Sequence, residues 1–179
     1  GNHDSMIQQK PDGFDLYFCK ENRSKWVYLE DSGTEFEGLK IWGSPWTKSL
    51  PGMNPHCKAF TVDTEEELEE KWAMIPEDTN ILITHSPPIS IFDWNMYGDS
   101  CGSKSLLNKA TDLPRLKIFI FGHIHEAYGM YESSDLINFA EENKHIMGAP
   151  TCKSMPYIVN ASHVNEHYKP VNKPVRIVL

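Results

Sequence analysis

The sequence predicts an α/β fold in which two buried strands each end next to a histidine. Residues 80–84 and 117–121 are short apolar runs, as expected of strands that are covered on both faces. His85 follows the first run, and the segment 122–125 (Gly-His-Ile-His) follows the second. Helical patterns precede and separate the two runs, and α/β proteins bind ligands at the carboxyl ends of such strands.

A hairpin and a helix come first along the chain. Trp26–Glu30 and Phe36–Gly43 are expected to form two strands joined by the turn sequence Asp-Ser-Gly. Thr64 and Glu67 fit a capping box at the start of an acidic, amphipathic stretch. We therefore predict a helix that begins there and runs to Ile75, where a proline follows.

The second half of the chain continues the alternation. Ser103–Ala110 predicts a short helix before the second apolar strand, and Ser133–Asn143 predicts a further helix. Tyr157–Ala161 and Val175–Leu179 are expected to be the last strands. Because no repeat or linker-like stretch separates these elements, we treat residues 1–179 as one domain.

Charge and hydropathy exclude several classes of partner. The net charge of -8 disfavours long nucleic acids, whose binding needs a basic surface. A small phosphate ester remains compatible, because bound metal cations reverse the local potential of an acidic protein. No apolar run approaches the roughly 20 residues of a membrane span, so we expect no membrane contact.

The cysteines and the first residues favour a cytoplasmic protein. No two cysteines form a CxxC pair, which indicates reduced thiols. Residues 1–10 are polar and lack the pattern of a signal peptide. The four cysteines are Cys19, Cys57, Cys101 and Cys152.

Three clusters of potential metal ligands lie far apart in the sequence: residues 1–4 (Gly-Asn-His-Asp), 84–88 (Thr-His-Ser-Pro-Pro) and 122–125 (Gly-His-Ile-His). Imidazole and amide oxygen suit Zn, Fe or Mn. Taken singly, a histidine after a strand is more often a hydrogen-bonded structural residue than a ligand, and the first cluster can be a turn. His123 and His125 point to the same side of an extended segment, which by itself leaves metal ligation and a structural role equally open.

In this order the three clusters resemble the motifs of the calcineurin-like metallophosphoesterases. The signature of that superfamily is DxH, GDxxD, GNH(D/E), a strand-end His and GHxH, of which the last three are present and the first two absent. The runs 41–46 and 160–174 are most similar to the MPPED-type branch, relatives of class III cyclic-nucleotide phosphodiesterases. The resemblance implies a four-layer αββα sandwich of two mixed sheets, here lacking the N-terminal βα units.

The resemblance also implies a dinuclear metal site. Asn2, His85 and His123 would coordinate one divalent metal ion (Mn, Fe or Zn), and His125 would coordinate the second. The absent motifs would supply the remaining ligands, so we expect the 179 residues alone to hold only part of the site. In this family two metals about 3.5 to 4 Å apart support an in-line displacement at phosphorus.

Two further residues of the first cluster match catalytic positions. His3 matches the histidine that protonates the leaving oxygen, and Asp4 matches its orienting partner. Either has a structural alternative, because His3 can pack and an Asp before a helix can cap it. Among Trp42, Trp46 and Trp94, Trp46 or Trp94 in particular would wall a base-binding pocket unless they belong to the core. The remaining histidines are expected to be surface or structural residues: His56, His145, His163 and His167.

The predicted function is hydrolysis of small phosphodiesters, such as cyclic nucleotides, by a metal-dependent phosphoesterase. One alternative is a non-catalytic fragment or degenerate homologue that acts as a binding partner. A second alternative, within enzymes, is a phosphoprotein phosphatase.

Overall fold

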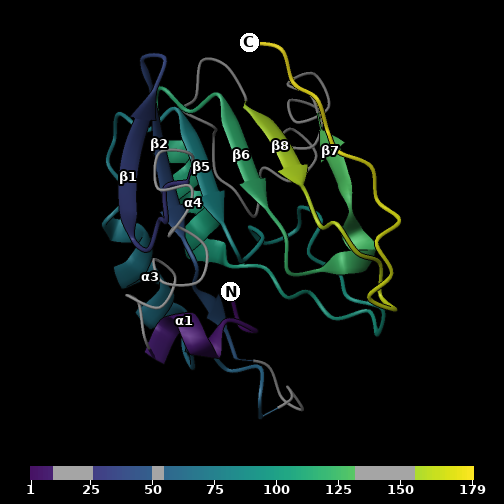
Figure 1. Cartoon of the computed structure of the whole chain (residues 1–179). Helices are drawn as coiled ribbons and strands as arrows, with labels where there is room; N and C mark the ends of the chain where they lie inside the picture. Colours follow the sequence, from purple (N-terminus) through teal and green to yellow (C-terminus); the bar gives the residue numbers. More distant parts are fainter. Residues whose placement is uncertain (10–25, 50–54, 132–155) are drawn as a thin grey trace.

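The computed structural model describes residues 1–9, 26–49, 55–131 and 156–179 (Figure 1). The predicted helix Ser133–Asn143, the histidine at 145 and the cysteines at 19 and 152 lie outside these residues.

A six-stranded mixed sheet forms the main body of the chain, in the order β1-β2-β5-β6-β8-β7. The four central strands are parallel, and the edge strands β1 and β7 are antiparallel to their neighbours. The strands are β1 Ser32–Phe36, β2 Leu39–Ser44, β5 Ile81–Thr84, β6 Ile118–Phe121, β7 Gly129–Tyr131 and β8 Tyr157–Asn160. The α/β prediction is confirmed, including both strands that end next to a histidine.

A second, small sheet pairs β3 (Thr47–Lys48) with β4 (Thr61–Val62) in parallel. Together with the mixed sheet it is consistent with the metallophosphoesterase fold that the resemblance implies. The predicted strand Val175–Leu179 is wrong, because both neighbours of β8 are already β6 and β7. Figure 1 shows the yellow C-terminal tail running past β7 without joining the sheet.

The hairpin turns later in the chain than the sequence predicts. Phe36 pairs with Leu39, so the turn consists of Glu37 and Gly38, with φ of 49° and 78°. Two positive φ angles in a two-residue loop match a type I′ turn, whose twist suits a hairpin. The predicted strand Trp26–Glu30 is therefore wrong. The Asp-Ser-Gly sequence is not the hairpin turn. Its Asp31 carboxylate accepts hydrogen bonds from Ser44 and Trp46 at the far end of β2.

Both helices predicted between the strands are confirmed. Thr64 caps α3 (Glu65–Ala73) in a complete capping box with Glu67. Ser103 caps α4 (Lys104–Asp112), because its hydroxyl accepts from the amide of Leu106. A further short helix, α1 (Ser5–Gln9), follows the first ligand cluster.

One face of the sheet carries the hydrophobic core. Figure 1 shows α4 behind β2 and β5, and α3 packs against α4. The Trp72 indole of α3 also donates to the Ser103 hydroxyl at 3.1 Å. The core includes buried side chains of both helices and of three central strands: Leu68, Trp72, Leu82, Leu106, Phe119 and Ile158.

The parallel strands bring their carboxyl ends to one edge of the sheet. Ser44 of β2 is in register with Thr84 of β5, and Phe121 of β6 is in register with Asn160 of β8. Figure 1 shows the N-terminal segment at the end of the sheet to which the arrowheads of β5, β6 and β8 point. All three ligand clusters therefore meet at this edge, where α/β folds place ligands.

Candidate metal centre

Asn2 is held at this edge by the loop before β4. The Asn2 carbonyl accepts from the amide of Ala59 at 3.1 Å, and Asn2 Nδ2 donates to the Cys57 carbonyl at 3.2 Å. Because Nδ2 is used by Cys57, the amide oxygen faces the other way. That oxygen lies 2.8 Å from Nε2 of His85.

His85 and His123 face each other from neighbouring strand ends. The His85 amide donates to the Ser44 carbonyl at 3.0 Å, which continues the β2–β5 ladder by one residue. The His85 carbonyl in turn accepts from the amide of Gly122 at 3.4 Å. These bonds fix the backbone on both sides, and the two imidazole centroids are 4.6 Å apart.

The His123 backbone adopts a strained turn. Its φ is 68°, and the amide of Ile124 donates to the carbonyl of Gly122 at 2.8 Å. A bond across three residues with a positive central φ is the rarer form of the γ-turn. Such a conformation costs on the order of 1–3 kcal/mol and is found where surrounding contacts and function require it. The turn aims the His123 ring at His85.

Tyr168 connects the two remaining histidines of the site. Its ring contacts the His125 ring edge-on at a centroid distance of 5.1 Å and the His3 ring at 6.2 Å. Tyr168 has φ of 58° in a turn that Asn165 closes by accepting from the amide of Lys169. Sequence reasoning missed Tyr168, because nothing near it resembles a ligand motif.

The structure gives His3 and Asp4 different partners. His3 Nδ1 lies 3.4 Å from the Cys57 Sγ, whereas the Asp4 carboxylate lies 2.5 Å from the backbone nitrogen of Gly1. The Asp4 carbonyl also accepts from the amide of Gln8, so Asp4 begins α1. In this arrangement Cys57, not Asp4, contacts the His3 ring.

Gly1 packs directly against the His85 ring. A Cβ atom built on Gly1 would lie 2.2 Å from Nδ1 of His85, closer than any real Cβ contact. The first cluster therefore needs a glycine for close approach of its backbone to the imidazole.

Burial keeps the facing imidazoles neutral. Burial, followed by the proximity of His123, lowers the pKa of His85 well below its usual range. Burial, followed by the proximity of His125, lowers the pKa of His123 to about 4. The pKa of His125 is also lowered by burial, although Glu126 opposes the shift. Neutral imidazoles keep a lone pair for a metal ion.

The ligand side chains open into one cavity of about 250 Å³. The Tyr97, Met96 and Tyr168 side chains at the cavity are largely exposed, and Glu126 and Glu166 supply two carboxylates. All the predicted site residues except Asp4 line it: Asn2, His3, His85, His123 and His125.

The predicted tryptophan wall is not part of this cavity. Trp46 packs against the core and lies edge-on to Phe60, with Lys71 over its ring. Trp94 is exposed but does not line the cavity. The aromatic residues at the cavity are instead Tyr97 and Tyr168.

The donor set fits a divalent metal ion in part. Ligands about 2.1 Å from a metal and at right angles to each other lie about 3 Å apart, close to the separation of Asn2 Oδ1 and His85 Nε2. In the part of the chain that the structure describes, His, Cys, Asp and Glu side chains alone form no group of three that could hold a metal. Any site formed by His85 and His123 within this part of the chain would therefore also have to use the amide oxygen of Asn2.

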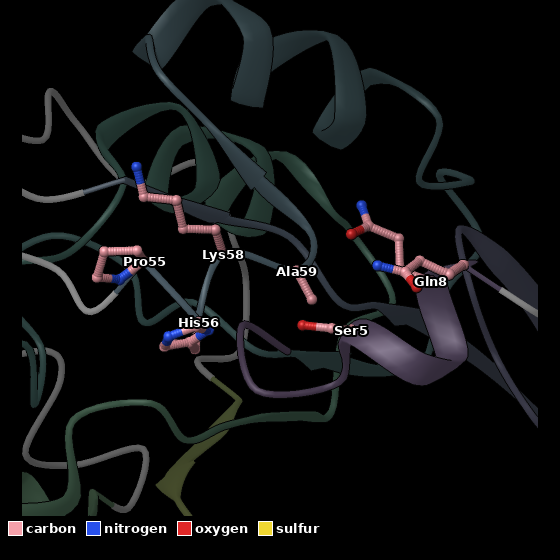
Figure 2. A pocket seen from close by; sticks show the side chains of 7 residues that line it. Ser5, Gln8, Pro55, His56, Lys58 and Ala59 are labelled. Carbon is pink, nitrogen blue, oxygen red and sulfur yellow. The ribbon is translucent and has the colours of Figure 1, made fainter.

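A second cavity, of about 350 Å³, lies between α1 and the facing loop. Figure 2 shows Ser5 and Gln8 of α1 on one side of the cavity and Pro55, His56 and Lys58 of that loop on the other. None of the predicted site residues lines this cavity. Over the described ranges, no helix combines the length and apolarity that crossing a membrane requires.

Comparison with known proteins identifies relatives that are similar to most of this chain. Metallophosphoesterase domain-containing protein 1 of Homo sapiens is 34% identical over 154 residues, which are 86% of this chain and 40% of the human protein. The UPF0046 protein T07D4.2 of Caenorhabditis elegans is 30% identical over 163 residues, covering 84% of this chain and 40% of the worm protein. The chain thus spans about two fifths of the length of the curated relatives it matches.

A family model described as calcineurin-like phosphoesterase matches residues 1–127, which include all three ligand clusters. The resemblance predicted from the sequence is confirmed, including its MPPED-type relatives. The chain belongs to the calcineurin-like phosphoesterase family of metal-dependent phosphoesterases.

Proposed function

We propose that this chain forms part of a phosphodiesterase site that hydrolyses small phosphodiesters, such as cyclic nucleotides, with a dinuclear metal centre. The observation that carries the proposal is the convergence of Asn2 and His85, in contact at 2.8 Å, with His123 facing His85 across 4.6 Å. Family membership supports metal-dependent phosphoester hydrolysis. Specificity for diesters and the presence of a second metal ion are parts of this proposal that family membership alone does not specify.

Asn2, His85 and His123 would hold one metal ion, and His125 would belong to the second. When bound, divalent metals polarise a phosphoryl oxygen and lower the pKa of water, which hydrolysis at neutral pH requires. The chain's own contribution is a set of buried, neutral donors whose backbone is fixed by strand-end hydrogen bonds. Fixed donors need little reorganisation when substrate binds.

His3 is the residue placed to supply a proton to the leaving oxygen. It lines the same cavity as the ligands and lies on the Tyr168 side, near His125. Cys57 holds His3 Nδ1, which leaves Nε2 as the ring nitrogen free to donate. In this proposal Cys57 orients the His3 ring, and Asp4 acts by starting α1.

The size of the cavity favours a small ester over a protein substrate. About 250 Å³ lies below the usual range for drug-sized ligands and accommodates a phosphate with part of one organic group. The Tyr97 and Tyr168 rings at the cavity offer apolar surface to a base or aryl group. The negatively charged Glu126 and Glu166 would repel a free phosphate dianion more than a singly charged diester.

The test is hydrolysis by the full-length protein loaded with Mn²⁺. We expect turnover of bis(p-nitrophenyl) phosphate and of a cyclic nucleotide, abolished by EDTA and by His85→Ala, with little turnover of a phosphopeptide. Preferred turnover of the phosphopeptide would establish the phosphoprotein phosphatase instead. Tight Mn²⁺ binding without turnover of any of the three substrates would favour the non-catalytic binding partner.

A further inference from the structure

Asn160 is a fully buried polar residue at the carboxyl end of β8. It is 0% exposed, and within the described residues its side chain hydrogen-bonds to main-chain atoms. Nδ2 donates to the carbonyl of Ile124 at 2.8 Å and, more weakly, to that of Phe92 at 3.4 Å. Oδ1 accepts from the amide of Ser162 at 3.0 Å. Burying an amide is favourable only when such partners are present, and here all are backbone groups.

The bonded carbonyl belongs to the residue between two predicted metal ligands. Ile124 lies between His123 and His125, and its oxygen receives a second donor, the Ser162 hydroxyl, at 3.4 Å. Its own amide closes the strained turn at His123. A residue with positive φ keeps that conformation only if the surrounding structure holds it. Asn160 and Ser162 are the side chains that hold it from the C-terminal side.

The orientation of the Asn160 amide is set by the same contacts. The amide of Ser162 can only donate, so it faces Oδ1 and turns Nδ2 toward Ile124. The Asn172 side chain donates to the carbonyls of Ser162 and Val164, which ties the tail to this point. The tail segment that carries Tyr168 is thus anchored to the turn that carries His123.

We propose that Asn160, assisted by Ser162, is a positioning residue that fixes His123 and His125 for metal binding. The inference rests on the proposed function, since it takes these histidines to be ligands. Residues that orient metal ligands without touching the metal typically change metal affinity or activity by about 10- to 100-fold when substituted. A merely structural role would change stability and leave the affinity of the folded protein unaltered.

The experiment is Co²⁺ titration of the full-length protein, followed by absorption and calorimetry, at a temperature where every variant is folded. Asn160→Asp keeps the shape and the acceptor for Ser162 but removes both donations from Nδ2. Thr79→Val is the matched control, because Thr79 is 2% exposed and donates to the Pro76 carbonyl at 2.7 Å before β5, away from the site. Amide exchange of residues 122–127 is measured on the same samples.

For Asn160→Asp we expect a rise in the Kd for Co²⁺ of at least about 10-fold and faster exchange at 122–127, with neither change in Thr79→Val. Ser162→Ala is a smaller change and is expected to raise the Kd for Co²⁺ several-fold. It replaces Asn160→Asp in the test if that variant does not fold. An unchanged Kd in the folded variants would overturn the inference. If His85→Ala bound Co²⁺ with the same Kd as the wild type, that result would instead overturn the proposed function.

Discussion

The amide oxygen of Asn2 lies 2.8 Å from Nε2 of His85, although the two residues are 83 positions apart in the sequence. This contact joins the first ligand cluster to the end of β5. It depends on the Cys57 carbonyl, which occupies the Asn2 Nδ2 and so turns the amide oxygen toward the imidazole. The donor pair is therefore built by three separate segments of the chain.

Replacing Gly1 should disrupt this contact more than replacing Gly122. A Cβ at Gly1 would lie 2.2 Å from the His85 ring, whereas at Gly122 it would meet only the Ser162 hydroxyl at an ordinary 3.5 Å. We expect Gly1→Ala to weaken Mn²⁺ binding at least about 10-fold and Gly122→Ala to change it less than about 3-fold. Calorimetric titration of both full-length variants checks this, and equal effects would contradict the close packing of Gly1 on His85.

The metal-free protein should lose stability as pH falls from about 6.5 toward 4. The pKa of His123 is about 4 in the folded chain, against about 6.5 when unfolded, so the unfolded state binds more protons in this window. This contribution of His123 is fully present above about pH 6.5 and amounts to about 3 kcal/mol. Urea unfolding at about pH 7 and about pH 5 should show about 2 kcal/mol of it lost, because the loss continues down to about pH 4.

The control for this pH dependence is His123→Asn, which removes the titrating group and tolerates a positive φ. Its stability should vary less with pH than that of the wild type. If the free energy of unfolding changed equally with pH in both proteins, His123 would not be buried in its neutral form.

His3 should matter most for poor leaving groups. In the metal-loaded full-length protein, His3→Ala should slow esters with basic alkoxide leaving groups by about 10²- to 10⁴-fold, because these need a proton in the transition state. Activated aryl esters should slow far less. Comparing kcat/KM across leaving groups checks this, and equal losses for both classes would mean that His3 only packs.

Tyr168 should act through its ring. Tyr168→Ala removes the contacts with His125 and His3, worth about 0.5–1.5 kcal/mol as an aromatic pair, so we expect a loss of about 3- to 10-fold in kcat/KM for a diester. Tyr168→Phe should keep nearly the wild-type kcat/KM, because the ring remains. Phe36→Ala is the control, since Phe36 is similarly exposed at the hairpin end of β1. A large loss in Tyr168→Phe would assign the role to the hydroxyl.

The strands that precede the ligands were predictable because their apolar runs are short and a histidine follows each run within two residues. His85 and Gly122 follow β5 and β6, and parallel pairing alone brings these ends together. The capping box of α3 was equally readable, since both partners lie within four residues. These features depend on local sequence or on a simple topological rule.

The parts that were not predictable depend on contacts between distant residues or on unusual backbone angles. The type I′ turn at Glu37 and Gly38 lacks the usual Asn-Gly or Asp-Gly signal. Tyr168 lies at the site on a tail that Asn172 anchors by donating to the Ser162 carbonyl. The contact of Cys57 with His3 depends on a loop whose position only the fold determines.

The most direct test of the metal centre is a crystal structure of the full-length protein grown with Mn²⁺, with anomalous data collected near the manganese edge. We predict an anomalous peak about 2.1–2.3 Å from Asn2 Oδ1 and from the imidazole nitrogens of His85 and His123. Well-occupied Mn²⁺ elsewhere, with Asn2 still hydrogen-bonded to His85 and no peak between these residues, would contradict the account.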